Sequence, residues 1–189
     1  MATKNARLLV VCSALLLGGL TAATGSRDEM TDASASPSRP FRERVAAYAE
    51  LRQQIVRDLL DKGVYADAED DGGEFRSRLG LAIRDARRHA QPGDIFSLQS
   101  AGYMRQVVQN ALHGKDDILS EIPEVPLVRV NDFYPEGEPL ATVPPLLLQQ
   151  LEPLPQALQY RFLANHLILL DIDTALIVDF VANALPRSF

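Results

Sequence analysis

The sequence predicts an α+β fold, in which about three N-terminal helices pack on a small C-terminal antiparallel β-meander. Over residues 41–112, apolar side chains recur at spacings of three and four, as they do in amphipathic helices. Residues 160–180 show the period of two that is typical of strands, with candidate turns between them. The segment 114–155 contains eight prolines, and we expect it to wrap around the domain as extended chain.

Three helices are expected, over residues 41–60, 74–90 and about 98–112. Gly63 ends the first, the sequence QPGD ends the second, and the third follows a candidate N-cap, Ser97. Gly102 weakens the helical pattern of the third. The apolar stripes of the first two helices are Phe41, Val45, Tyr48, Ile55 and Leu59 in one, and Phe75, Leu79, Ala82, Ile83 and Ala86 in the other.

Two short elements are expected within the proline-rich segment. The sequence VPLVRVN, 125–131, is interpreted as a short strand because β-branched residues favour strands. The sequence PPLLLQQL, 144–151, is interpreted as a short helix, since proline suits the first helical position, where no N–H bond is needed.

The C-terminal meander is expected to contain three strands, at 160–163, 167–172 and 176–180, joined by three-residue turns. This register places Arg161, Asp171 and Asp179 together on a mixed face. Shifting one turn by a single residue would place Asp179 among the apolar side chains. The opposite face is then wholly apolar and is expected to pack on the helices; it consists of Tyr160, Phe162, Ile168, Leu170, Ile172, Leu176, Val178 and Phe180.

Residues 1–23 have the three-part plan of a secretory signal peptide. Lys4 and Arg7 precede an apolar run that is too short for a comfortable membrane span, and small residues follow. Cleavage after Ala23 or after Gly25 fits this pattern, and an uncleaved anchor is the alternative. The only cysteine, Cys12, lies inside this segment, so the mature chain would contain no disulfide. These features predict a periplasmic or secreted protein with no membrane span after cleavage.

Two further regions complete the predicted organisation. Residues 24–40 are small, polar and punctuated by proline, which predicts a disordered linker, and residues 41–189 are expected to form a single domain. Removing residues 1–23 removes two bases and no acid, which moves the formal net charge from −6 to −8. This acidic balance argues against a nucleic-acid partner, because phosphate binding needs clustered Lys and Arg.

The sequence LILLDIDTAL, 167–176, resembles the first motif of the haloacid-dehalogenase-type phosphatases. This resemblance implies that Asp171 is a nucleophile and Asp173 a general acid beside a magnesium ion. That family places the motif near the start of a doubly wound domain, whereas only sixteen residues follow Asp173 here, and none is a lysine. The favoured interpretation is a turn in which the side chain of Asp173 bonds the backbone.

Residues 67–78 approach the calcium-binding loop of an EF-hand. Asp67, Glu69 and Asp71 occupy the first three ligand positions, but Arg78 replaces the bidentate acid at position twelve. A weak calcium site at these three acids is therefore one hypothesis. The alternative is an acidic loop between two helices, whose charges favour the start of the second helix.

No nucleophile, nucleotide or metal motif of known spacing is found in the sequence, so no catalytic residue and no cofactor are expected. The sequence therefore favours a non-enzymatic periplasmic module that binds an envelope protein or a small ligand. The alternative is a metal-assisted hydrolase with a dispersed site, which would use Asp132, Glu136 or Asp171 with His166.

Residues 130–186, from VNDFYPEGEP to VANALP, resemble the C-terminal half of an uncharacterised family of exported bacterial proteins. The shared pattern is a proline-rich wrap, a Tyr-x-Phe strand at Tyr160 and a Leu-Leu-Asp hairpin at 169–171. A looser similarity extends to QPGDIF, 91–96, and to the helical half. The resemblance implies export and this fold, and it implies no activity, cofactor or catalytic residue.

Overall fold

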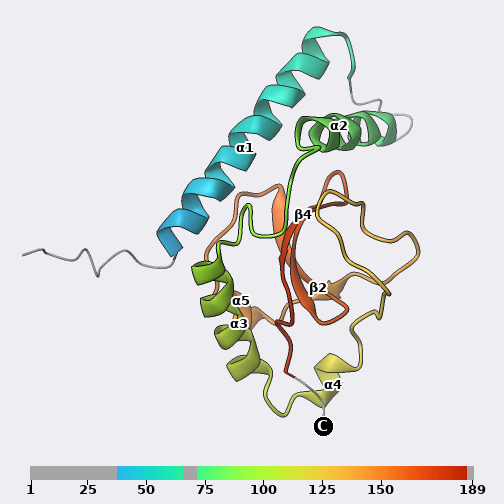
Figure 1. Ribbon diagram of the computed structural model, residues 1–189. Coiled ribbons are helices and arrows are strands. Elements are labelled where there is room, and N and C mark those ends of the chain that lie inside the picture. The colour runs from blue at the N-terminus through green and yellow to red at the C-terminus, as the bar shows by residue number, and fades with distance from the viewer. Residues whose placement is uncertain (1–37, 66–71, 187–189) are drawn as a thin grey trace, which may run out of the picture. The chain divides into compact units, whose positions relative to one another are not determined.

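The computed structural model describes residues 38–65 and 72–186. It confirms an α+β fold, in which N-terminal helices are followed by a C-terminal antiparallel sheet (Figure 1). The elements in chain order are α1 (Ser38–Asp61), α2 (Gly73–Ala86), α3 (Leu98–Leu112), α4 (Asp116–Leu119), β1 (Ala141–Thr142), α5 (Pro145–Leu148), β2 (Leu158–Leu163), β3 (His166–Asp171) and β4 (Leu176–Val181).

Helix α1 begins at Ser38, so the last three residues of the predicted linker form its first turn. The physical reason is a tertiary contact: Glu152 bonds the side chain of Ser38 and accepts from Arg42 Nη1 at 3.1 Å. The other residues of the predicted linker, and the predicted signal peptide 1–23, lie outside the described residues. Further along α1, Phe41, Val45, Tyr48 and Ile55 are buried as predicted and Leu59 is half-buried.

Helices α2 and α3 match their predictions apart from one end. Asn131 Nδ2 donates to the carbonyl oxygens of Arg84 and Arg87, so α2 ends at Ala86 rather than near residue 90. Ala86 is exposed, contrary to its place in the predicted stripe. At the start of α3, the backbone N–H of Ser100 donates to Ser97 Oγ at 3.2 Å, which confirms the predicted N-cap.

The sheet is a four-stranded meander in the order β1-β2-β3-β4, with every pair antiparallel. The sequence analysis missed β1, which spans two residues and is followed closely by Pro144, a residue without an N–H to continue the pairing. The strand predicted at 125–131 is wrong. That segment contains Pro126 and is irregular. Just after it, Phe133 forms an isolated antiparallel bridge with Leu176.

The predicted register of β3 is wrong by one residue. The β2–β3 turn has two residues rather than three, because Leu163 pairs with His166 directly and Ala164 takes a φ of 49°. Tyr160 therefore pairs with Leu169 and Phe162 with Leu167. A one-residue shift exchanges the two faces of the strand, so Asp171 lies on the face that we expected to be wholly apolar.

A β-bulge changes the faces of β4 as well. Leu169 pairs with Asp179 and Leu170 with Ile177, which leaves Val178 as the extra residue. Val178 belongs to the core beneath the helices, and Asp179 also bonds to the chain on that side, whereas Phe180 packs on the opposite side. The predicted mixed face, which grouped Asp171 and Asp179 with Arg161, is therefore wrong.

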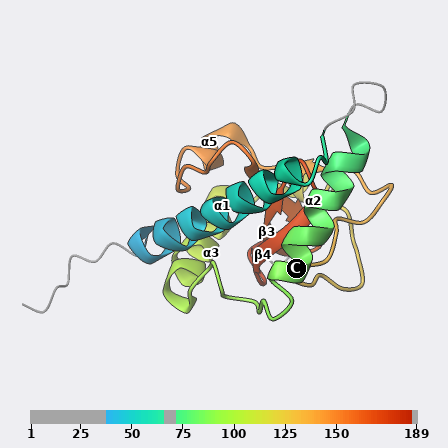
Figure 2. The same cartoon turned by 90° about the horizontal axis from the view of Figure 1, so that it is seen from above.

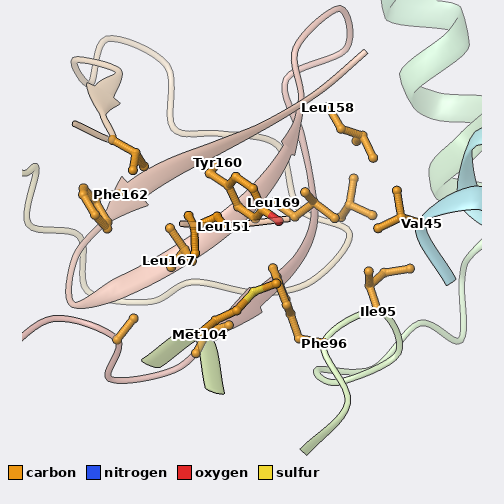
Figure 3. Packing of buried hydrophobic residues seen from close by; sticks show 14 of the residues in the cluster. Val45, Ile95, Phe96, Met104, Leu151, Leu158, Tyr160, Phe162, Leu167 and Leu169 are labelled. Carbon is orange, nitrogen blue, oxygen red and sulfur yellow. The ribbon is translucent and has the colours of Figure 1, made fainter. Parts of the chain in front are cut away.

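Both faces of the sheet are covered. On one face, Tyr160, Leu167 and Leu169 point toward Phe96 and Met104 of the helical layer (Figure 3). On the other face, Ile168 and Ile177 belong to a second cluster that Val128 and Tyr134 of the proline-rich wrap complete. In Figure 1, α3 and α5 lie on one side of the strands, and the chain between α4 and β1 lies on the other. Burial on both faces explains the nearly continuous apolar sequence of β3 and β4.

Helices α1 and α2 contact each other and lie at an angle over β3 and β4 (Figure 2). Helix α2 contacts the β3–β4 turn closely, since a Cβ at Gly80 would lie 3.2 Å from Thr174 Cβ. Within residues 38–65 and 72–186, no helix combines the length and the apolar character that crossing a membrane requires.

Candidate ligand pocket

Asp171, the last residue of β3, is fully buried and joins the sheet to α1. Its Oδ2 accepts from Tyr48 Oη and from Arg52 Nε, both at 2.8 Å. Its Oδ1 accepts from the backbone N–H of Thr174 at 3.3 Å. Both oxygens of this carboxylate are thus engaged, which offsets the cost of removing it from water.

Arg52 extends the network to the β3–β4 turn, because its Nη2 donates to Asp173 Oδ2. The Arg52 side chain is 15% exposed and that of Asp173 is 49% exposed. The guanidinium is held between a buried carboxylate and a half-exposed one, so its position is fixed by two charge-assisted bonds.

Tyr48 is held as a neutral hydrogen-bond donor. Burial raises the pKa of its phenol well above the usual value of 10.0, and the neighbouring charge of Asp171 raises it further. The Arg87 guanidinium carbon lies 5.2 Å from the centroid of the Tyr48 ring, a cation–π contact. Burial also lowers the pKa of Arg87 from its ordinary value.

A pocket of about 430 Å³ lies beside this network. Its volume is within the range of small-molecule sites, roughly 300–1,000 Å³. Three segments that are distant in the sequence form it: one face of α1, the chain that leads into β2, and the β3–β4 turn. The lining residues are Tyr48, Ala49, Arg52, Gln53, Pro155, Gln156, Ala157, Leu158, Ile172 and Asp173.

Asp179 is a second buried carboxylate, and it ties β4 to the loop before α3. Its Oδ1 accepts from the backbone N–H groups of Gly93 and Phe180, and its Oδ2 from those of Ile95 and Phe96, at 2.7–3.0 Å. Burial raises the pKa of Asp179, and these four bonds partly offset the effect. Because all four groups donate, the side chain acts only as an acceptor, which is a structural role.

The aspartates of the phosphatase-like motif are arranged for a turn. Asp171 is inaccessible and both its oxygens are bonded, so it is not placed to attack a substrate. The interpretation of the turn needs one correction: Asp171, rather than Asp173, bonds the turn backbone, at Thr174. Asp173 instead pairs with Arg52 at the edge of the pocket.

The residues of the alternative hydrolase hypothesis are dispersed. Asp132 Oδ1 lies 3.8 Å from Arg84 Nη2, and the side chain of Glu136 is exposed in the proline-rich wrap. His166 is at the opposite end of β3 from Asp171, with its ring 5.0 Å from that of Phe180. In the part of the chain that the structure describes, no group of three or more His, Cys, Asp or Glu side chains could hold a metal ion.

The acids of the calcium hypothesis, Asp67, Glu69 and Asp71, lie outside the described residues. Gly72 has a φ of 71°, and α2 begins at the next residue. Arg78, at position twelve of the EF-hand-like pattern, bonds Glu74 one helical turn earlier.

Sequence reasoning missed Tyr48 and Arg52 as partners of Asp171. Tyr48 was placed in the core stripe of the first helix, and Arg52 was not singled out. Their spacing of four residues carried a usable signal, because it places both side chains on one face of a helix. A buried tyrosine one turn before an arginine needs a polar partner, but this spacing does not say which acid of the chain provides it.

Comparison of the chain with protein-family models, with curated proteins and with solved structures finds no match in any of the three.

Proposed function

We propose that the chain is an exported, non-enzymatic binding module whose binding site is the pocket between α1 and the β3–β4 turn. The observation that supports this function is the pocket itself, about 430 Å³ in volume, with a wall that the Asp171–Arg52–Asp173 network fixes in place. A wall held by buried charge-assisted bonds is preorganised. Binding a ligand then costs less free energy, because the wall is already ordered.

The polar groups of the pocket suit binding better than catalysis. Tyr48 donates to Asp171 and stays protonated, and Asp171 has no oxygen left for a substrate. The lining groups with hydrogen-bonding capacity to spare include the amides of Gln53 and Gln156, Nη1 of Arg52 and the second oxygen of Asp173. Amides and one exposed carboxylate can orient a ligand, but they provide no activated nucleophile.

The size of the pocket favours a small ligand over an envelope protein as the occupant. To test this, the labelled full chain is titrated with a panel of small amines, carboxylates, amides and sugars, and backbone NMR shifts are followed. We expect at least one class to shift the signals of the pocket residues.

Two variants of α1 make this experiment specific. Ala49→Phe fills the pocket from its wall, whereas Ala47→Phe places the same side chain on an exposed position of the same helix. Binding should be lost in Ala49→Phe and retained in Ala47→Phe. If no class shifts the pocket residues, or if Ala49→Phe binds as the wild type does, the pocket is not the binding site.

Export rests on the charge and apolar pattern of residues 1–23. N-terminal sequencing of the protein from a bacterial envelope fraction should give a chain that starts at Thr24 or Ser26. A chain that starts at residue 1 or 2 in the membrane fraction would instead indicate an uncleaved anchor. The same start in the cytosolic fraction would contradict export.

A further inference from the structure

We propose that the pocket beside Arg52 selects a primary ammonium group on an aliphatic chain, as carried by a free alkylamine or by a lysine side chain. This inference rests on the proposed binding function and adds the chemical class of the ligand. Three features of the pocket wall support it: its charge, its one accessible carboxylate and its apolar surface.

The three charged side chains of the Arg52 network, of which Arg52 and Asp173 line the pocket and Asp171 is buried behind them, carry a net negative charge. Arg52 contributes one positive charge, and Asp171 and Asp173, both bonded to it, contribute two negative charges. The guanidinium is thus more than neutralised by its own partners, and two of its donor nitrogens are already used. An anionic ligand would meet a site of net negative charge, whereas a cation is attracted.

The accessible carboxylate is that of Asp173. Its side chain is 49% exposed and lines the pocket, and its bond to Arg52 uses Oδ2, which leaves Oδ1 to accept from a ligand. An ammonium group has three donors and no acceptor. One can bond Asp173 Oδ1, and the side-chain oxygens of Gln53 and Gln156, which line the same pocket, can accept the others.

The apolar part of the wall suits the aliphatic chain that carries the ammonium group. Ala49, Pro155, Leu158 and Ile172 line the pocket, and Ile172 is exposed although it is a large apolar residue. Methylene groups that cover such a surface are removed from water, and this adds favourable free energy. A small ammonium ion without an aliphatic chain would lack that contribution.

The test compares three probes of equal length on the full chain by calorimetry and NMR: butylammonium, 1-butanol and butanoate. Butylammonium should bind at the pocket residues, at least about tenfold more tightly than the other two. Two further probes, 1,4-diaminobutane and an acetyl-Gly-Lys-Gly-amide peptide, distinguish a free amine from a lysine side chain as the source. Tighter binding of the diamine indicates a free amine, and tighter binding of the peptide indicates a protein ligand.

The matched variants are Asp173→Asn and Asp132→Asn. Each removes a half-exposed carboxylate that lies beside an arginine, but only Asp173 lines the pocket. Asp173→Asn should weaken butylammonium binding about tenfold or more, and Asp132→Asn should leave it unchanged. Both variants are expected to fold, since exposed ion pairs contribute little to stability.

The inference is overturned if butylammonium binds no more tightly than 1-butanol, or if Asp173→Asn has no effect. An equal effect of Asp132→Asn would also overturn it, because the attraction would then be a general property of the acidic surface. If butanoate or a sugar shifts the pocket residues while amines do not, the ligand class is wrong and the proposed binding function stands. If no probe class binds, both fail.

Discussion

Asp171 and Asp179 are both fully buried, and each accepts hydrogen bonds from a different part of the helical layer. Asp171 bonds two side chains of α1, whereas Asp179 bonds the backbone of the loop before α3. A buried carboxylate is tolerated only when its bonds replace those it made to water. These two residues therefore connect the sheet to the helical layer at two separate points.

Replacing Asp179 by asparagine should destabilise the fold strongly. Asparagine keeps the shape, but its amide nitrogen would face backbone N–H groups that also donate, so at least one buried donor loses its partner. We expect the free energy of unfolding to fall by about 2 kcal/mol or more in urea titrations. Asp132→Asn, at a half-exposed site, should change it by no more than about 0.5 kcal/mol. Equal effects of the two substitutions would contradict the role given to Asp179.

His166 should make stability depend on pH. Burial lowers its pKa from 6.5, and its Nδ1 accepts from the backbone N–H of Asn183 at 3.3 Å, as a neutral imidazole can. The unfolded chain thus binds a proton more readily than the folded one, so the free energy of unfolding falls as pH drops below about 6.5.

Unfolding titrations between about pH 7.5 and pH 5.5 measure this contribution. His166→Gln should flatten the slope over that interval, whereas His113→Gln, at an exposed position after α3, should leave it unchanged. A slope that His166→Gln does not alter would show that another group titrates in this range.

At the scale of the elements, the three long helices were predictable, whereas the short helix α4 and the register of the sheet were not. The stripe of α1 and the N-cap of α3 follow from local sequence, because a helix that is solvated on one side alternates visibly between apolar and polar residues. In β3 and β4 both faces are buried, so the alternation that sets register is nearly absent. A two-residue turn, a four-residue turn and one bulge then fit the apolar pattern as well as two three-residue turns do.

The docking of α2 gives a prediction at this scale. A Cβ at Gly80 would lie 2.9 Å from Phe133 Cε1 and 3.2 Å from Thr174 Cβ. Gly80→Ala should therefore destabilise the protein by about 1 kcal/mol or more, although alanine is the better helix former. The expected result in thermal or urea unfolding is a lower midpoint.

Gly102→Ala in α3 is the matched control. A Cβ there meets nothing within 4 Å, so only the gain in helix propensity remains. This variant should be more stable than the wild type by about 0.5–1 kcal/mol. If Gly80→Ala were stabilising to the same degree, α2 would not dock against the turn as described.

At the scale of the whole molecule, the candidate site depends on long-range contacts. Its wall combines residues of α1, the chain before β2 and the β3–β4 turn, and the Tyr48–Asp171 bond spans 123 residues. The sequence pattern placed Tyr48 in the core and Asp171 on a strand, and each placement was correct. Their contact could not be predicted, because it depends on the register of β3, which the apolar pattern left open.

Asp171 connects α1 to the β3–β4 hairpin, and it holds Tyr48 and Arg52 in the pocket wall. The most direct test is a double-mutant cycle on Tyr48→Phe and Asp171→Asn, measured as free energies of unfolding in urea. The two substitutions should be coupled by about 1 kcal/mol or more, because one removes the donor of this buried bond and the other removes the charge of its acceptor. Tyr103→Phe, at an exposed tyrosine, should show no coupling with Asp171→Asn. If the effects of Tyr48→Phe and Asp171→Asn on the free energy of unfolding simply add, to within about 0.5 kcal/mol, the Tyr48–Asp171 bond does not connect α1 to the hairpin.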